Sequence, residues 1–349
     1  MWSLVALPHS PLIARSLPRS AGRVHWASSA AFDRSEYGLF INGKFASSSA
    51  TGEDSRLAVE NPATTERLAF VANATAADVD RAVASAHRAF EDGAWSRASV
   101  AHRANVLNDI AKALRERIPE FAEKESLQTG RPIREMRAQL MRIPEWFEYF
   151  AALARTSEGS VPPFSGPYVN YVRRLPLGTV GLVEPHLLRI HAMVERAKQA
   201  GAAIRCGGRR APGLKGYFYE PTVITDVTPL MEIVQEEVFG PVVAAYSFKD
   251  EGEAVRLAND SSFGLGAAIW TNDIKRAHRV AHSVEAGIIW LNDHHRNDPS
   301  SPWGGVKDSG MGRENGLEAY RSYSQVKSVI VGFGNEKFDW FVDDTVRYG

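Results

Sequence analysis

The chain has 349 residues, of which 44% are hydrophobic and 23% charged, and these proportions predict a globular protein with enough apolar material for two domains. Lys plus Arg and Asp plus Glu both total 41, so no excess of basic charge indicates a nucleic acid or an anionic membrane surface as a partner. The single cysteine excludes an internal disulfide framework, and no apolar run approaches the roughly 18 residues of a membrane-spanning helix.

Residues 1–32 have the composition of a mitochondrial presequence. They contain many serines, no acidic residue and three arginines, Arg15, Arg19 and Arg23. Pro8 and Pro11 interrupt the only apolar stretch, which disfavours a secretory signal. An untargeted tail on a cytoplasmic protein is the alternative that this composition leaves open.

A hairpin and a capped helix are predicted next. LFINGKF (39–45) alternates apolar and polar residues around an Asn-Gly pair, which is typical of a short hairpin. Residues 74–90 have apolar side chains at helical spacing, and Thr75 with Asp78 resembles a capping box.

Further helical patterns cover residues 98–130 and 131–155. The first pattern ends at Gly130, a plausible helix stop, and the second contains Pro144, which predicts two helices or one kinked helix. Four aromatic residues in the second pattern are predicted to be core rather than a ligand-stacking box: Trp146, Phe147, Tyr149 and Phe150.

Residues 167–178 alternate as a strand or ribbon, and after Gly178 the pattern changes repeatedly between strand and helix. Strands are predicted at 178–183, 202–208, 242–248, 265–271 and 287–292, with helices at 187–201, 250–260 and 273–284. This alternation indicates an α/β domain with a largely parallel sheet. A last alternating stretch, 321–331, predicts a strand that stands apart from that sheet.

Two polar motifs carry little chemistry by themselves. GMGREN (310–315) lacks the third glycine of a dinucleotide fingerprint and predicts a turn. DHHRND (293–298) predicts a polar loop at the carboxyl end of a strand, where ligand sites of α/β proteins form. A metal site there is the less favoured alternative, because adjacent histidines on an extended chain point in opposite directions.

Cys206 is flanked by arginines, which favour a reactive thiolate. It stands at a predicted strand end before two glycines, with no His or Glu placed to activate it, so an inert structural thiol is the favoured interpretation. QEEVFGPV (235–242) holds a carboxylate, Glu237, and an aromatic ring, Phe239, one residue apart on a turn. From the residues alone, Glu237 could bind the hydroxyls of a ribose while Phe239 packs against a flat ring. The segment could equally be a structural turn with a packed phenylalanine.

Together, several long motifs resemble the aldehyde dehydrogenase superfamily. The resemblance covers nearly all of the chain after the leader and is carried by LFINGKF, ENPAT, ESLQTGRPI, RRLPLGTVGLVEP, GYFYEPTVITDV, QEEVFGPV, FGLGAAIWT, AGIIWLND and SPWGGVKDSGMGRENG. It implies an α/β fold with parallel-sheet domains and a strand arm that builds homo- or hetero-oligomers. It also implies NAD or NADP as cofactor, with Glu237 on the nicotinamide ribose and Phe239 beside the nicotinamide ring. Trp303 and the DHHRND loop would line the mouth of the aldehyde site.

The chain departs from the family pattern between Pro185 and Leu188. In the family, a cysteine thiolate adds to the aldehyde, amide donors hold the oxyanion, hydride passes to NAD(P), and a glutamate activates water. The segments that would supply the nucleophile, the glutamate and most of the cofactor site are missing as one block. Residues 187–208 resemble a segment downstream of the nucleophile, so Cys206 matches a position with no catalytic role.

The resemblance divides the chain as follows: 1–32 presequence, 35–165 amino-terminal part of the cofactor-binding domain, 166–177 oligomerisation ribbon, 178–186 first strand of the truncated cofactor-binding sheet, 187–320 carboxyl-terminal part of the catalytic domain, 321–333 oligomerisation strand, and 334–349 tail. Because the central part of the fold is missing, we expect exposed apolar surface and a tendency to aggregate.

We therefore expect a family protein that is inactive as written. Two alternatives remain open at this point. One is a non-catalytic oligomerisation partner of full-length subunits, and the other is an exon-skipped or incomplete gene model of an active enzyme. The sequence does not identify the aldehyde that the intact relative oxidises. Trp303 indicates only that its pocket is lined by an aromatic residue.

Overall fold

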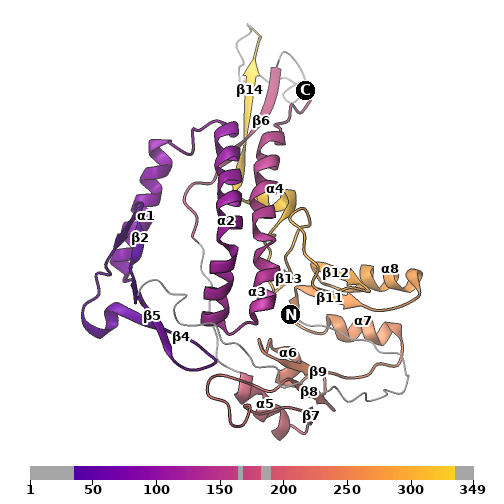
Figure 1. The fold of residues 1–349 in the computed structure, drawn as a ribbon. Coiled ribbons are helices and arrows are strands. Elements are labelled where there is room, and N and C mark those ends of the chain that lie inside the picture. The colour runs from indigo at the N-terminus through magenta and orange to yellow at the C-terminus, as the bar shows by residue number, and fades with distance from the viewer. Residues whose placement is uncertain (1–34, 164–167, 182–189, 335–349) are drawn as a thin grey trace, which may run out of the picture.

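The computed structural model describes residues 35–163, 168–181 and 190–334, and it shows an α/β protein (Figure 1). The predicted presequence, the junction between Pro185 and Leu188, and nearly all of the predicted tail lie outside the described residues. No helix in the described ranges is long and apolar enough to cross a membrane.

Short strands open the described chain: β1 (Glu36–Tyr37), β2 (Leu39–Ile41), β3 (Lys44–Ala46), β4 (Arg56–Glu60) and β5 (Arg67–Ala72), with a 3-10 turn η2 (Gly52–Ser55) before β4. The predicted hairpin is confirmed, since β2 and β3 pair in antiparallel fashion. Its turn residues Asn42 and Gly43 have φ of 54° and 74°, the left-handed conformations that a tight two-residue hairpin turn requires. β1, β5 and β4 form a separate small sheet.

Helix α1 (Ala76–Asp92) begins with the predicted capping box. The Thr75 side chain accepts from the N–H of Asp78, and the Asp78 carboxylate accepts from the N–H of Thr75 at 2.9 Å. Asp78 is only 1% exposed and also accepts from the backbone N–H of Ser49 at 3.0 Å, so it ties the loop after β3 to the helix start. These backbone hydrogen bonds hold the pKa of Asp78 well below its ordinary value, against the opposing effect of burial.

The expected exposed apolar surface is present on α1. Val79 and Val83 belong to the apolar face of this helix, yet each is 52% exposed. In Figure 1, α1 stands apart from the long helices α2 and α4. Aggregation itself stays a prediction.

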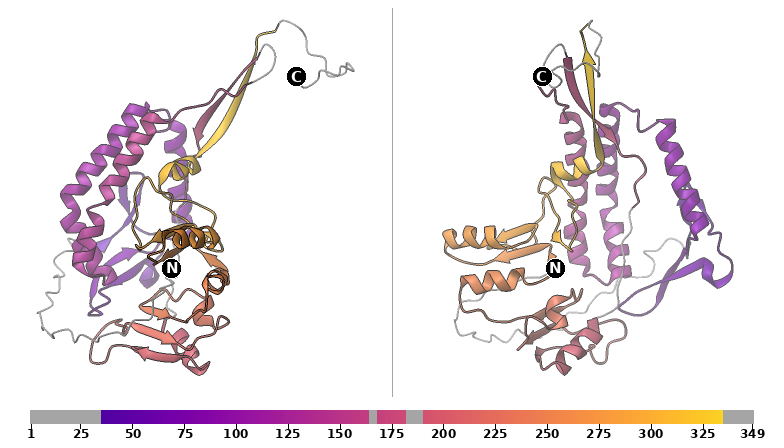
Figure 2. Two further views of the ribbon diagram at one scale, coloured as in Figure 1. Left: turned by 90° about the vertical axis from the view of Figure 1, so that its right-hand side faces the viewer. Right: turned by 180° about the vertical axis from the view of Figure 1, so that it is seen from behind.

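A long helical hairpin follows, made of α2 (Val100–Thr129), α3 (Ile133–Leu140) and α4 (Ile143–Thr156). Gly130 has φ of 76° and ends α2 as predicted, because a left-handed residue stops the helical ladder there. Pro144 lies in the first turn of α4, so the predicted proline break is confirmed as two helices. α2 and α4 run side by side (Figures 1 and 2). The Arg115 guanidinium of α2 donates two hydrogen bonds, of 2.6 and 2.7 Å, to the Glu148 carboxylate of α4.

A two-stranded arm is built from distant parts of the chain. β6 (Tyr168–Pro176) and β14 (Ser324–Gly332) pair in antiparallel fashion over their whole length, from Tyr168 opposite Gly332 to Pro176 opposite Ser324. Figure 2 shows the arm projecting beyond the helices. The ribbon and the final strand predicted from the sequence are thus one element, and their role in oligomers stays a prediction.

The carboxyl-terminal half contains two α/β units. The first has α5 (Ile190–Gln199), β7 (Ala203–Cys206), β8 (Thr222–Thr225), α6 (Glu232–Gln235) and β9 (Val242–Ala244), packed around a core that includes Met193, Val194, Ile224 and Ile233. The second has α7 (Glu251–Asn259), β10 (Phe263–Gly264), β11 (Gly266–Ile269), α8 (Ile274–Ser283), β12 (Ile288–Leu291) and β13 (Val306–Lys307), and α9 (Gly316–Ser322) leads into the arm.

The predicted parallel sheet is only partly present. Parallel ladders join β8 to β9 and β11 to β12, but β7-β8-β9 and β11-β12 are separate sheets among the described strands. Residues 178–181 were expected to begin a strand, yet they carry none, because no described strand pairs with them. The predicted strand 242–248 is likewise cut to three residues, since the ladder with β8 covers 242–244 and the N–H of Ala245 makes the last hydrogen bond to that strand.

The capping carboxylate gives a prediction on stability. Asp78→Asn removes a charge that is stabilised by the backbone N–H groups of Thr75 and Ser49 and by the side chain of Arg81, so unfolding in urea at pH 7 occurs at a lower urea concentration than in the native sequence. Because the pKa of Asp78 is lowered on folding, its contribution is complete at neutral pH and is lost as the pH falls below about 4, the pKa of an unfolded Asp. The difference in urea midpoint between the native sequence and Asp78→Asn therefore becomes smaller in acid.

Asp80→Asn is the matched control, because Asp80 is an exposed residue on the same helix and makes no cap. A gap for Asp78→Asn that stays constant from pH 7 into acid, or that Asp80→Asn reproduces, contradicts this assignment.

Candidate functional site

The turn with the predicted cofactor residues links α6 to β9 and is held against α5. A Cβ on Gly240 would lie 2.4 Å from Cδ1 of Ile190, so a larger residue at this position requires the Ile190 side chain to move. Phe239 has φ of 52°, a conformation that costs roughly 1–2 kcal/mol for a residue with a side chain, and its ring is 78% exposed. Glu237 instead lines a cavity. The two predicted residues thus share a turn, but they differ in their surroundings.

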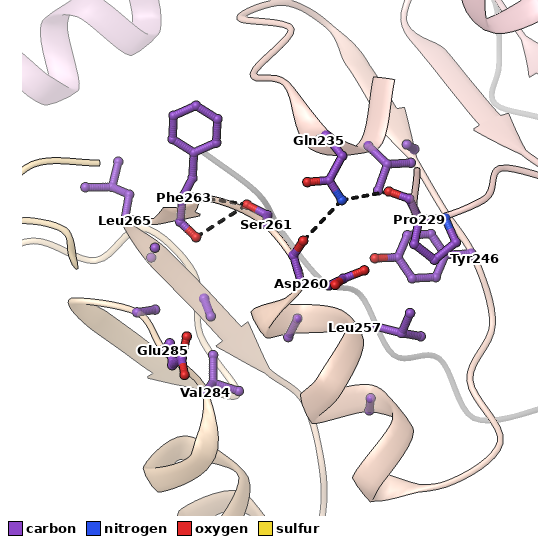
Figure 3. Close-up of a pocket in the computed structure, with 18 of the residues that line it drawn as sticks. Pro229, Gln235, Tyr246, Leu257, Asp260, Ser261, Phe263, Leu265, Val284 and Glu285 are labelled. Carbon is purple, nitrogen blue, oxygen red and sulfur yellow. Dashed lines mark hydrogen bonds between the residues drawn. The ribbon is translucent and has the colours of Figure 1, made fainter. Parts of the chain in front are cut away.

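This cavity lies between β9 and β11, with α7 beside it (Figure 3). Its volume is about 160 Å³, and apolar residues such as Val243, Leu257 and Leu265 line much of it. At one side, Gln235 Nε2 donates to the carbonyls of Pro229 at 2.7 Å and Asp260 at 3.2 Å. A cavity of this size admits a benzene-sized group, whereas pockets for larger ligands have about 300–1,000 Å³.

Aromatic and imidazole rings gather where β12 ends. We call this group the ring cluster; its members are Trp270, Trp290, His294, His295 and Trp303. The centroid of Trp290 lies 5.6 Å from His294 and 5.4 Å from Trp303, and Trp290 Nε1 donates to the carbonyl of Arg296 at 2.8 Å. The predicted substrate-site residue Trp303 is therefore in contact with the predicted polar loop.

The expectation that His294 and His295 point in opposite directions is wrong. Both rings face Trp290, and their centroids are 5.9 Å apart. The physical reason is that His295 has φ of 56°, so the chain is not extended there and the strand alternation fails. Burial lowers the pKa of His295, and the positive charges of His294 and Arg131 lower it further.

Hydrogen bonds anchor the loop to the helical half of the protein. Asn315 is buried, accepts from Trp146 Nε1 at 2.6 Å and donates to Asn297 Oδ1 at 3.0 Å. Arg142 donates to the carbonyl of Asn297 at 2.8 Å. Trp303 exchanges two backbone hydrogen bonds with Glu314, of 2.7 and 2.6 Å, which form an isolated antiparallel bridge. The hydrogen-bonded turn lies just before GMGREN, where the N–H of Gly310 donates to the carbonyl of Lys307 at 3.2 Å.

Cys206 ends β7, the outer strand of its sheet, as predicted. Its thiol is exposed and lies 3.6 Å from the carbonyl of Pro221. The neighbouring arginines are engaged in ion pairs of 3.1 Å, Arg205 with Asp226 and Arg209 with Glu220. The ring cluster belongs to the other α/β unit, so the thiol and the predicted substrate loop come from different sheets (Figure 1).

A metal centre is not formed by the described side chains. Within residues 35–163, 168–181 and 190–334, no group of three or more His, Cys, Asp or Glu side chains is placed to hold an ion. The one carboxylate of the loop beside the histidines, Asp293, is paired with Arg296 at 2.7 Å, and that hydrogen bond lowers its pKa.

Sequence reasoning missed two contributors to this region. Trp290 was assigned only to a strand, although a tryptophan that alternates inward before a polar loop is the signal of a buried platform. Trp146 was assigned to the core, and its indole N–H in fact connects α4 to Asn315. No local pattern reveals that contact, because 169 residues separate the two.

The fold matches solved aldehyde dehydrogenases. The betaine aldehyde dehydrogenase of Staphylococcus aureus, solved with NAD+, superposes with a TM-score of 0.81 at 22% identity, over 88% of this chain and 97% of that enzyme. An aldehyde dehydrogenase of Bacillus cereus, also solved with NAD+, gives 0.79 at 25% identity, over 86% and 97%. A sequence model of the aldehyde dehydrogenase family matches residues 49–186 and 184–329, and the chain belongs to this family.

Sequence relatives are more similar but are matched over a limited length. A peroxisomal aminoaldehyde dehydrogenase 1 of Pisum sativum is 47% identical over 149 residues, which are 42% of this chain and 30% of that enzyme. A betaine aldehyde dehydrogenase of Brucella anthropi is 46% identical over 150 residues, 42% of this chain and 31% of that enzyme. The matched stretch thus spans about a third of the length of these relatives.

The anchor at Asn315 gives a second prediction. Asn315→Ala leaves the indole N–H of Trp146 without its acceptor, and we expect a loss of roughly 1–3 kcal/mol in the free energy of unfolding, measured in urea. In a Trp146→Phe background, Asn315→Ala lowers the free energy of unfolding by less, because the indole N–H donor is already absent. Equal losses in the two backgrounds would show that this hydrogen bond does not join the halves.

Proposed function

We propose that this chain is an aldehyde dehydrogenase family protein that does not oxidise aldehydes in the form given by its sequence. The observation that carries the proposal is the position of Cys206, the one cysteine of the sequence. The reaction needs a thiolate at the aldehyde, with a base and oxyanion donors beside it. Cys206 instead stands at the edge of β7, in a different sheet from the ring cluster and Trp303.

A missing internal block supports this proposal. The two stretches matched by the family overlap at residues 184–186, where the sequence departs from the family pattern. The pea relative is longer than this whole chain, because 149 residues make up only 30% of it. The superposition on the S. aureus enzyme nevertheless spans 97% of that chain, so both ends of the fold have counterparts. We infer that the difference in length is internal.

The residues do not fit a complete NAD or NADP site. Glu237 lines a cavity of about 160 Å³, far below the volume of a dinucleotide pocket, and Phe239 is exposed to solvent. We infer that Glu237 and Phe239 keep the ribose and ring positions of the family, and that the remainder of the cofactor cradle belongs to the missing block. No catalytic step is assigned to this chain.

A turnover assay tests the proposal. Purified protein with NAD+ or NADP+ and a panel of aldehydes that includes betaine aldehyde is expected to give no rise in NAD(P)H absorbance above a heat-denatured sample. A full-length aldehyde dehydrogenase is the positive control for the assay. Enzymatic turnover that disappears in Cys206→Ala would overturn the proposal and would identify the nucleophile.

A second candidate function is that of a silent subunit, and the arm is the observation that favours it. β6 and β14 form a complete ladder, no other described strand pairs with β14, and apolar side chains of β14 are in solvent, Val326 being 63% and Ile330 54% exposed. Open edges and exposed apolar side chains favour association with another chain. A full-length family member is the partner of this candidate function.

Co-expression with a full-length relative tests the silent-subunit function. The two chains are expected to co-migrate in size-exclusion chromatography, and Val326→Asp with Ile330→Asp is expected to separate them. Leu214→Asp is the matched control, since Leu214 is a similarly exposed apolar residue, 58%, away from the arm. Separate elution of the unsubstituted chains contradicts this function.

A further inference from the structure

The cavity between β9 and β11 lies where two separate sheets of the described chain, β7-β8-β9 and β11-β12, adjoin without pairing. β9 leads through α7 and the two-residue strand β10 to β11, and a strand, a crossover helix and a strand is the connection that normally joins strands of one parallel sheet. Here β9 is the last strand of β7-β8-β9, and β11 is the first strand of β11-β12. Val243 and Ala244 of β9 and Gly266 and Ala267 of β11 line the cavity between the two strands.

The backbone of β9 presents an open edge to this cavity. Ala245 N–H donates to Ile224 of β8 at 2.8 Å, and the carbonyl of Pro241 accepts from Thr222 at 2.8 Å. In a parallel ladder, successive residues direct their N–H and C=O groups to opposite sides. The groups of Ala244 therefore point away from β8 and toward the cavity, which Ala244 lines.

The sequence of this edge is that of a longer, apolar strand. VVAAYSF (242–248) has strand character throughout, but only 242–244 form a ladder. Val243 is 48% and Phe248 37% exposed, so the edge is both apolar and accessible. An exposed apolar edge is a template for pairing with another extended chain.

The cavity itself has room for one large side chain of a bound peptide, which we call the anchor side chain. Its volume of about 160 Å³ matches a single large apolar side chain, since about 150 Å³ holds benzene. An extended peptide that pairs with a sheet edge gains affinity from main-chain hydrogen bonds and specificity from one or more side-chain pockets. The open edge and the cavity beside it supply both parts.

We propose that the open edge of β9 binds one extended, apolar segment whose anchor side chain enters the cavity, and that this segment is a strand of a longer aldehyde dehydrogenase. The occupant follows from the internal difference in length: we infer that the relatives carry residues between the two matched stretches, and β9 and β11 belong to separate sheets although a crossover helix connects them. This inference rests on the proposed function, because it requires that the block be missing here.

The test uses short overlapping peptides that tile the pea aminoaldehyde dehydrogenase 1, each with a fluorescent label, titrated with the full chain. We expect one peptide, from outside the matched 149 residues, to raise the fluorescence anisotropy on binding. N-methylation of alternate peptide amides is expected to weaken binding by about tenfold per blocked hydrogen bond for one set of positions, and little for the other. Binding of no peptide, or equal binding of all N-methylated forms, overturns the proposal.

Ala244→Pro tests the same edge from the protein side. It removes an N–H that faces away from β8, and proline is tolerated on an edge strand in that orientation. Peptide binding should fall about tenfold while urea unfolding changes little, and unchanged binding overturns the proposal. Because no turnover is measured, this result is separate from the activity assay: an inactive chain that binds no peptide overturns the strand site alone.

Discussion

The ladder between β6 and β14 fixes the path of the whole chain, because it pairs residues 168–176 with residues 324–332. Such a closure carries a large loop-entropy cost, which nine consecutive antiparallel pairs offset together with the contacts at the base of the arm. Among those contacts, the hydrogen bonds from Trp146 and Arg142 to Asn315 and Asn297 join the helical half to the loop of the ring cluster. The loop that carries the histidines is thus held against the helical half at Asn297.

Local signals predicted the elements that local chemistry determines. The Asn42–Gly43 hairpin, the capping box of α1 and the glycine stop of α2 each depend on residues within four positions of one another, and all are present. The aromatic cluster of α4 and the turn of QEEVFGPV were also found from their patterns. Their tertiary roles were not, because Trp146 donates to Asn315 and the cavity that Glu237 lines is formed largely by later segments of the chain.

Predictions failed where they assumed a pairing strand or an extended backbone that the structure does not have. Residues 178–181 and 246–248 have strand-forming sequences but do not pair with any described strand, and strand propensity cannot replace a missing ladder. The histidine pair was treated as extended chain, whereas His295 adopts a left-handed conformation that no single residue in DHHRND announces. β8 went unassigned because glycine, proline and aromatic residues surround its four-residue core, although it is the central strand of its sheet. Family motifs, not periodicity, revealed the departure at Pro185.

The single exposed thiol also has a practical consequence. A maleimide dye reacts at one position of the sequence, Cys206, and this position lies on β7, two strands from β9 in the same sheet. Neighbouring strands are about 4.8 Å apart, so the dye would stand roughly 10 Å from the β9 edge without covering it. The protein thus carries a natural attachment point for a spectroscopic reporter, and no engineered cysteine is needed to observe that edge.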